Sequence, residues 1–202
     1  ERIGIMENNK LKVKDLVNIG VFSAIYFIIS MLVMALAMFS PVFWLAWPAM
    51  SGIICGSLYV LLSAKVTKKG VAFLMAVITG IIYFACGECT WVIVLTFIVA
   101  GLLAEVVRAV LGYKSTKAVV LSCGVLTLGF IGSPLPMWLF QDSYMNSIIE
   151  MGMSATYVNS MQSMISVGSL ILMIIGALLG GMIGALIGKA IFKKHFAKAG
   201  II

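Results

Sequence analysis

The residues best suited to chemistry lie in the segment FACGECTWVI, where Cys86 and Cys89 enclose Glu88. Such a cysteine pair occurs in zinc sites and in redox-active dithiols. A structural zinc site needs four ligands, but the single histidine lies in the C-terminal tail and no second close cysteine pair is present. No basic neighbour is present to activate a thiol. We therefore predict no metal site; the segment is either a polar turn or a pocket wall in which Glu88 contacts a ligand.

The composition determines where this segment can lie. Hydrophobic residues make up 62% of the chain and charged residues only 10%, which is too little charge to cover a water-facing surface. The apolar run from Leu16 to Phe39 would extend roughly 36 Å as a helix, enough to cross a hydrocarbon core of about 30 Å. Similar runs recur along the chain. We therefore predict an all-α, multi-pass integral membrane protein.

Polar or glycine- and proline-containing breaks divide the apolar sequence into six predicted transmembrane helices. These spans are 16–39, 45–64, 71–87, 90–112, 118–140 and 165–191. All 14 Lys and Arg residues fall on one side of this arrangement, whereas Glu88, Asp142 and Glu150 fall on the other. The positive-inside rule then predicts cytoplasmic N and C termini in the cell membrane of a prokaryote. It also explains the net charge of +7, so no nucleic-acid partner is expected.

The spans define three regions of the chain. We predict a cytoplasmic N-terminal segment at 1–15, a six-helix transmembrane domain at 16–191 and a basic cytoplasmic tail at 192–202. The first five residues, ERIGI, differ in character from the polar, basic segment that begins at Met6. We interpret residues 1–5 as a cloning remnant or upstream read-through and expect the native start near Met6.

All four tryptophans fall on the predicted outer side, at Trp44, Trp47, Trp91 and Trp138. A single tryptophan there is commonly an interfacial anchor, but four together favour the rim of a pocket. The long fifth loop, 141–164, carries methionine and tyrosine at helical spacing and could lie flat as an amphipathic lid. Its candidate ligand contacts are Asp142, Tyr144 and Asn146.

Small residues predict close helix contacts at two places. In the last span Gly176, Gly180 and Gly184, continued by Gly188, recur at four-residue spacing and form a smooth helical face. This face either packs within the bundle or docks a separate membrane subunit. Near the start of the first span, Gly20 and Ala24 form a shorter version of the same pattern.

Two further features allow alternative interpretations. Gly129, Gly132, Pro134 and Pro136 interrupt the fifth span, either as a structural kink or as the broken helix of a binding site. In the fourth span, Glu105 and Arg108 stand three residues apart and could neutralise each other, an arrangement that we favour over a proton relay.

No known catalytic motif is present: the sequence lacks HExxH, a Walker A lysine loop and GxSxG. We therefore expect neither an enzyme nor a resident cofactor. Because the sequence shows no nucleotide-binding segment, any ATP-driven transport would need separate subunits to hydrolyse ATP.

Taken together, the six spans, cytoplasmic termini, Gly20 and Ala24 on the first span, long fifth loop and basic KKHFAK tail resemble the substrate-binding S components of energy-coupling factor (ECF) transporters. The glycine-lined last span and the tail are most similar to the Trep_Strep group. The resemblance implies an S-component-like bundle that captures substrate at the outer face. It also implies docking, through small residues of the first span, onto a membrane T component driven by two cytoplasmic ATPase subunits.

Three classes of function remain at the level of sequence. The leading hypothesis is capture of a small micronutrient, vitamin-like or tetrapyrrole-like, by Glu88 and the tryptophans, since one carboxylate among aromatic rings suits a flat, partly apolar, cationic ligand. The second class is a stand-alone secondary transporter or channel, although the spans offer almost no charge in mid-membrane. The third is a non-transporting structural membrane protein that assembles through the glycine face.

Overall fold

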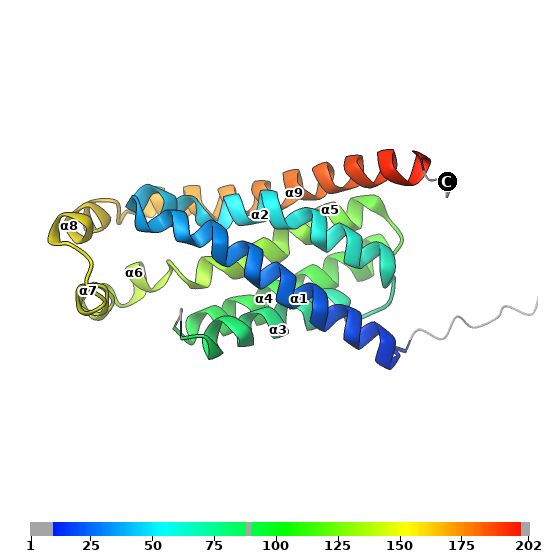
Figure 1. Cartoon of the computed structure of the whole chain (residues 1–202), viewed down its shortest axis with the longest axis horizontal. Helices are drawn as coiled ribbons and strands as arrows, with labels where there is room; N and C mark the ends of the chain where they lie inside the picture. The colour runs from blue at the N-terminus through cyan, green and yellow to red at the C-terminus, as the bar shows by residue number, and fades with distance from the viewer. Residues whose placement is uncertain (1–9, 88–89, 199–202) are drawn as a thin grey trace, which may run out of the picture.

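The computed structural model of the chain describes residues 10–87 and 90–198, and the side chains up to residue 193. Within these residues every regular element is a helix. Most helices run along the long axis, and three short ones gather at the end opposite the chain termini (Figure 1). The elements are α1 (Val13–Met34), η1 (Ala35–Met38), α2 (Pro41–Lys65), α3 (Val71–Ala85), α4 (Val92–Leu111), α5 (Thr116–Thr127), η2 (Leu128–Gly132), α6 (Pro136–Leu139), α7 (Gln141–Glu150), α8 (Ala155–Ser163) and α9 (Val167–Lys198).

Four of the described helices are long and apolar enough to cross a membrane. They are Val13–Met38, Pro41–Lys65, Val92–Leu111 and Val167–Lys193. The predicted third and fifth spans are shorter than expected, since the apolar helices there cover only Val71–Ala85 and Thr116–Gly132. The third ends early because the chain turns at Gly87, whose φ of 73° lies in the left-handed region that favours glycine.

The second span begins earlier than the predicted residue 45, so Trp44 lies in the same helix as Trp47. Ser40 is the N-cap, its hydroxyl accepting a hydrogen bond from the Val42 N–H at 3.4 Å, and Pro41 occupies the first helical position. A serine cap followed by proline is a standard helix start, because proline has no N–H and its φ is already helical. The segment FSPVF therefore both separates the first two spans and starts the second one.

At the opposite end, an ion pair joins the start of α1 to the connection between α2 and α3. The Asp15 carboxylate accepts hydrogen bonds from the Lys12 backbone N–H at 2.8 Å and from the Lys68 Nζ at 2.6 Å. The first contact caps α1, and a carboxylate in the first turn also complements the helix dipole. Asp15 thus fixes where the first helix begins and what it lies against.

The glycines of the last helix pack against α2, the most extensive helix pair in the structure. A Cβ at Gly180 would collide with the Ala49 carbonyl, and one at Gly184 with the Gly52 carbonyl. Gly176 is looser, since its Cβ would lie 3.5 Å from that of Ala49. The glycine face of the last span is therefore occupied by α2 of the same chain, and it is not open to a separate subunit.

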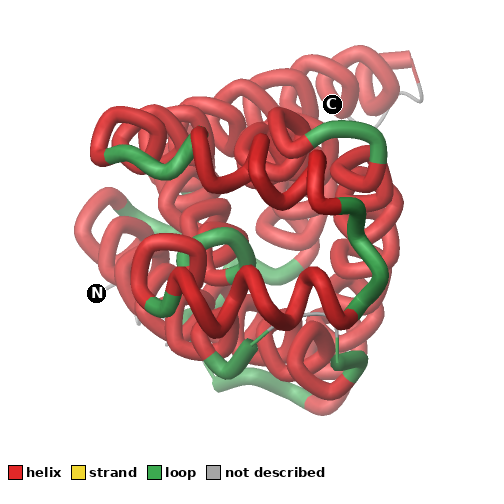
Figure 2. The backbone as a smooth tube through the Cα atoms, turned by 90° about the vertical axis from the view of Figure 1, so that its left-hand side faces the viewer, coloured by secondary structure: helices red, strands yellow, loops and turns green. Residues whose placement is uncertain are grey.

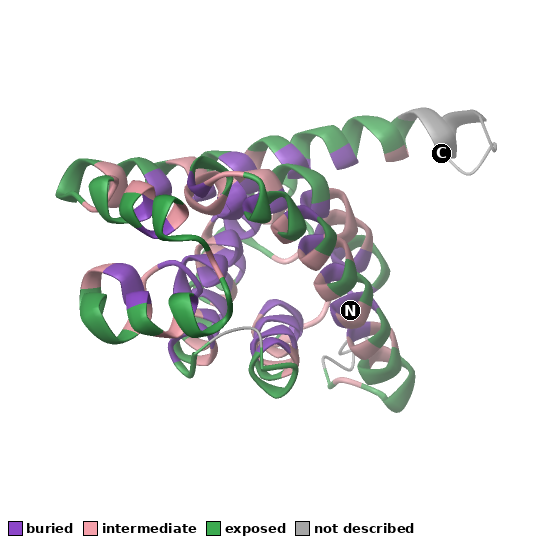
Figure 3. Cartoon of the chain, turned by 60° about the vertical axis from the view of Figure 1, so that its left-hand side comes forward, coloured by how far each residue is buried: buried purple, intermediate pink, exposed green. Residues whose placement is uncertain are grey.

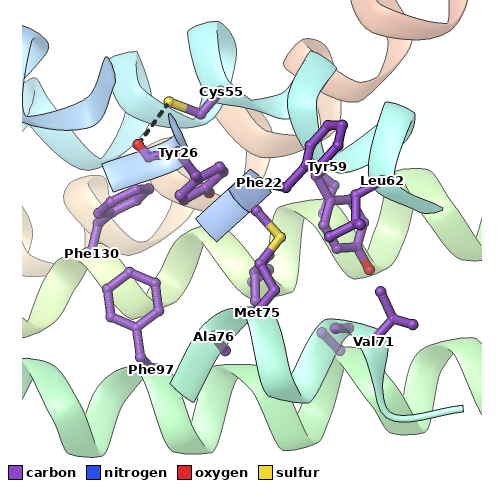
Figure 4. Packing of buried hydrophobic residues seen from close by; sticks show 14 of the residues in the cluster. Phe22, Tyr26, Cys55, Tyr59, Leu62, Val71, Met75, Ala76, Phe97 and Phe130 are labelled. Atoms are coloured by element: carbon purple, nitrogen blue, oxygen red, sulfur yellow. Dashed lines mark hydrogen bonds between the residues drawn. The ribbon is translucent and has the colours of Figure 1, made fainter. Parts of the chain in front are cut away.

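Buried aromatic rings fill the centre of the bundle between α1, α2, α3, α4 and η2. Phe130 of η2 stacks on Tyr26 with ring centroids 5.4 Å apart, and Phe97 of α4 meets Phe130 edge-on at 5.2 Å (Figure 4). Tyr83 and Ser30 are joined by a hydrogen bond of 2.6 Å between their hydroxyls. The outward side of α9 is exposed along much of its length (Figure 3), as expected of a helix that faces lipid.

The predicted fifth span is broken where its glycines and prolines occur. The helix α5 ends at Thr127 and the 3-10 turn η2 begins at Leu128. The rest of the predicted span, after Pro134, contains only the short helix α6. The Gly129 carbonyl accepts a hydrogen bond of 2.8 Å from the Thr96 hydroxyl of α4, and a Cβ at Gly129 would collide with the Phe97 ring. At Gly129 the break is thus packed against protein, whereas Ser133, further along the break, lines the cavity described below; irregular backbone at membrane depth is found in both surroundings.

The expected pairing of Glu105 with Arg108 is wrong. The Glu105 carboxylate instead accepts the backbone N–H groups of Gly70 at 2.6 Å and Ala72 at 3.2 Å, which caps the start of α3. The carboxylate is stabilised there by the free N–H groups and the positive end of the helix dipole. Arg108 is fully buried, and its guanidinium lies over the Tyr113 ring, 5.4 Å from the centroid.

Candidate ligand-binding site

A cavity of about 540 Å³ lies at the end of the bundle formed by α6, α7 and α8. Its walls come from the end of α1, from η1, from the start of α2, from the turn between α3 and α4, from Ser133 after η2, and from α7 and α8. Figure 2 views this end directly and shows α7 and α8, joined by a loop, lying across the bundle. A volume of this size suits a small organic molecule.

Methionine side chains supply much of the cavity wall. The six that line it are Met31, Met34, Met38, Met151, Met153 and Met161. Thioethers are polarisable and flexible, and they make favourable contacts with aromatic rings. No charged side chain occurs among the described lining residues. The described wall therefore favours an apolar ligand with a flat or polarisable surface.

Trp44 is the lining residue with the clearest unmet bonding capacity. Its indole Nε1 is buried and makes no hydrogen bond to any described residue. A buried N–H without an acceptor is costly, and such groups are rare outside functional sites. Pro48, four residues on in α2, has no N–H to donate to the Trp44 carbonyl, so the usual helical bond is also missing there. Trp44 therefore brings an aromatic face to the cavity wall, and the same ring carries a buried N–H with no described acceptor.

Trp47 lies beneath the cavity rather than in its wall. Its side chain is 0% exposed, its Nε1 donates to the Ser30 carbonyl at 2.9 Å, and its ring stacks on that of Trp44 at 6.1 Å. Tyr83 and Phe130 pack edge-on against it. Trp47 is thus a core residue that holds the Trp44 ring in place.

The connection between α3 and α4 reaches the cavity. Gly87 and Thr90 line it, on either side of Glu88 and Cys89, which lie outside the described residues. The predicted role of Glu88 as a ligand contact therefore stays a prediction. Cys86 is exposed and is a free thiol. Among the described residues no group of three or more potential metal ligands is found.

Tyr144 is the only one of the three predicted fifth-loop contacts that lines the cavity. Asp142 and Asn146 are exposed and lie outside its described wall. Trp91 is 54% exposed and packs near Phe140, at 6.4 Å, while the Trp138 indole donates to the Ser166 carbonyl at 3.0 Å. These two tryptophans stand beside the cavity and do not line it.

The fifth loop, which we expected to lie flat as a lid, forms two short helices with a small core of their own, and its role as a lid stays a prediction. Met137 of α6 is buried together with Met145, Ile148, Val158 and Met161 of α7 and α8. Tyr157 of α8 donates to the Ala37 carbonyl of η1 at 2.7 Å, which bridges the cavity between lid and bundle. Burial raises the pKa of Tyr157, so its phenol stays protonated and able to donate at physiological pH.

The residues from the first helix were missed by the sequence analysis. Met31, Met34 and Met38 occur in MLVMALAM at spacings of three and four, which places them on one helical face. This pattern could have identified them, but an apolar helix rich in methionine is equally expected to face lipid or protein. What distinguishes these residues is α7 and α8 folding back over the end of α1.

Gly20 and Ala24, the predicted docking residues of the first span, lie on an open part of α1. A Cβ at Gly20 would have nothing within 4 Å, and Ala24 is only partly buried. Their neighbours Val17, Val21 and Ile28 are exposed apolar residues. This stretch of α1 is therefore free for lipid or for another helix, in contrast to the glycine face of α9.

The long apolar helices and the cavity beneath α7 and α8 define a helical integral membrane protein with a ligand-sized cavity at one end. The chain belongs to the family described as hypothetical bacterial integral membrane protein (Trep_Strep), whose family model matches residues 13–198. Neither the search of curated proteins nor the search of solved structures gave a match.

Proposed function

We propose that this protein is the substrate-capture subunit of an ECF-type importer, and that it binds a small, flat, largely apolar micronutrient under α7 and α8. The observation that carries the proposal is the cavity of about 540 Å³, flanked by the helices α7 and α8 and lined by methionines and Trp44. A vitamin-like or tetrapyrrole-like molecule with a hydrogen-bond acceptor fits this chemistry. Glu88, next to lining residues, would add a charge if the ligand is cationic.

The proposed topology has six crossings, with α3 and the α5–η2 segment as the two short ones. The basic residues of the described chain lie near the start of α1, α3 and α5 and near the end of α2, α4 and α9. These helix ends lie opposite α6, α7 and α8 in Figure 1, and α7 and α8 line the cavity. The positive-inside rule would then place the termini in the cytoplasm and the cavity at the outer face. Substrate would therefore enter from outside.

A single chain of this kind needs partners for active transport. We expect a membrane T component and two cytoplasmic ATPase subunits, which would hydrolyse the ATP, so the chain itself would not be an enzyme. Gly20 and Ala24 support docking on α1, because the space above Gly20 is open and another helix could approach closely.

Two variants test capture and docking separately. Ala35→Trp would fill the cavity, since Ala35 lines it and is exposed, whereas Ala109→Trp adds the same bulk on an exposed position of α4. Small molecules that co-purify with the chain from bacterial membranes would be identified by mass spectrometry. We expect a bound molecule in the wild type and in Ala109→Trp, and its loss in Ala35→Trp.

Gly20→Leu addresses docking, because it places a bulky side chain where a Cβ has nothing within 4 Å and so leaves the fold intact. Co-expressed T component and ATPases should co-purify with the wild type and with Val17→Leu, but not with Gly20→Leu. Substrate uptake that continues in cells lacking those partner subunits would reject the proposal in favour of a stand-alone transporter.

A further inference from the structure

A second cavity, of about 230 Å³, lies at the opposite end of the molecule, between α2, α5 and α9. It is formed by the end of α2, the connection between α4 and α5, the first turns of α5 and the last third of α9. Its polar lining residues are Ser63, Thr67, Tyr113, Lys114, Thr116 and Lys189. The ligand cavity described above has no charged group among its described residues, so the two cavities suit different chemistry.

Positive charge converges on this cavity from three sources. Lys114 and Lys189 both line it, and no carboxylate occurs among its described lining residues. The helix α5 begins at Thr116, also in the wall, and the N-terminus of a helix carries partial positive charge and free N–H groups. The combination favours an anion with several acceptor oxygens.

Ser63 adds a buried hydroxyl to the wall. Its side chain is 2% exposed, it lines the cavity, and its Oγ lies beside the Tyr59 hydroxyl. A hydroxyl can donate one hydrogen bond and accept two, so Ser63 keeps bonding capacity for a ligand. An anion in the cavity would give Ser63 an acceptor.

Arg108 adds a buried charge just behind the wall. It is 0% exposed, and its Nε and Nη1 make no hydrogen bond to described residues. Its guanidinium lies over the ring of Tyr113, a wall residue, and its Nη2 donates to the Tyr113 carbonyl at 3.5 Å; among the described residues no carboxylate lies within salt-bridge distance of it. An unpaired buried cation is strongly unfavourable unless an anion is close by.

We propose that this cavity binds a phosphate-class anion, supplied by the headgroup of an anionic lipid or by free phosphate. Lys114 and Lys189 would contact the anion, Ser63 and Thr116 would donate hydroxyl hydrogen bonds, and Arg108 would add long-range attraction. The proposal does not depend on what the cavity under α7 and α8 binds. It would make the basic end of the bundle a specific anion site rather than a diffusely charged surface.

The test compares two lipids and free phosphate on the purified full chain in neutral detergent. Native mass spectrometry would measure binding of dioctanoyl phosphatidylglycerol and of dioctanoyl phosphatidylcholine, which differ in headgroup charge. Thermal unfolding would be followed with added inorganic phosphate, and with added sodium chloride at equal ionic strength. We expect tighter binding of the phosphatidylglycerol than of the phosphatidylcholine. A rise in Tm with phosphate, but not with chloride, would identify free phosphate as a second source.

Lys189→Gln and Lys193→Gln form a matched pair one helical turn apart on α9, and only Lys189 lines the cavity. We expect Lys189→Gln to weaken phosphatidylglycerol binding about tenfold, the loss of one charge-assisted hydrogen bond, while Lys193→Gln stays within about twofold of wild type. Lys114→Gln serves as a second variant should Lys189→Gln fail to fold. The proposal is overturned if the two lipids bind equally and phosphate has no specific effect, or if both α9 variants lose binding equally.

Discussion

At the scale of single residues, Trp44 combines the properties that a ligand contact needs. Its ring is held by stacking on Trp47, which is itself fixed by a hydrogen bond to Ser30. Its indole N–H has no described acceptor. A rigid aromatic face with an unused donor is pre-organised, so a ligand would lose little free energy in ordering it.

Replacing Trp44 with phenylalanine separates the donor from the ring. Trp44→Phe keeps an aromatic side chain but removes the N–H, so we expect the amount of co-purified ligand to fall roughly fivefold to tenfold, the worth of one hydrogen bond. Mass spectrometry on equal amounts of protein would measure it. Trp91→Phe, outside the cavity, should retain the wild-type amount. Equal ligand content in folded Trp44→Phe and in the wild type would show that the N–H is not used.

The residue types at the site were more predictable than their positions. The sequence predicted an aromatic pocket beside methionines of the fifth loop, and Trp44 and Tyr144 line the cavity as expected, whereas the methionines of the first helix were not foreseen. The sequence does not tell which of Trp44 and Trp47 lines the cavity. That depends on where α2 begins, at Pro41, because the helix start decides which ring faces the cavity and which faces the core. Burial depends on neighbours from other helices, which a linear pattern does not contain.

At the scale of elements, the contact between α2 and α9 requires backbone against backbone. At Gly184 any side chain would displace the Gly52 carbonyl, whereas at Gly20 there is open space. Both glycines lie within helices, where alanine is otherwise favoured by up to about 1 kcal/mol. Their replacement should therefore have opposite effects.

We expect Gly184→Ala to lower the free energy of unfolding by about 1–3 kcal/mol, the usual cost of overpacking. Gly20→Ala should be neutral or stabilising. Thermal unfolding of both variants in the same detergent would test this. A Gly184→Ala protein as stable as Gly20→Ala would mean that α2 and α9 separate easily.

The lid depends on few contacts with the bundle, and the Tyr157–Ala37 hydrogen bond is the most direct. Tyr157→Phe keeps the ring and removes this bond, so we expect a lid that opens more often and a ligand that dissociates several-fold faster. Hydrogen exchange of α8 would report the opening directly. Tyr113→Phe, at the opposite end of the bundle, is the comparison; unchanged exchange in Tyr157→Phe would mean that the core of α6–α8 alone holds the lid in place.

The long helices were predictable because their apolar runs are continuous and their caps are local signals. The interruptions of the helices were harder to predict. The glycines and prolines from Gly129 to Pro136 predicted an irregular segment, but only contacts with other helices show that Gly129 packs against Thr96 and Phe97 of α4 while Ser133 lines the cavity. Likewise the spacing of Glu105 and Arg108 predicted an ion pair. The Glu105 carboxylate instead accepts hydrogen bonds from backbone N–H groups at the start of α3.

At the scale of the whole molecule, the charge distribution predicts the orientation of the protein in the membrane, and thiol labelling can test it. Cys86 is an exposed free thiol at the cavity end, and Lys189 lies at the other. In a Cys89→Ser background, a membrane-impermeant thiol reagent should label Cys86 in intact cells. In a Cys86→Ser, Cys89→Ser background, Lys189→Cys should react only after permeabilisation. The reverse pattern would invert the proposed topology.

The shortness of α3 also affects the surrounding lipid. Its 15 residues rise about 22 Å, against a hydrocarbon core of about 30 Å. If α3 crosses the membrane as proposed, this flank has a hydrophobic mismatch of roughly 8 Å, while α1, α2 and α9 are long enough to span the full thickness. The bilayer must thin beside α3 or the bundle must tilt, each at a fraction of a kcal/mol per Å. The protein would therefore carry a one-sided patch of thinned bilayer, and acyl-chain length would bias its tilt.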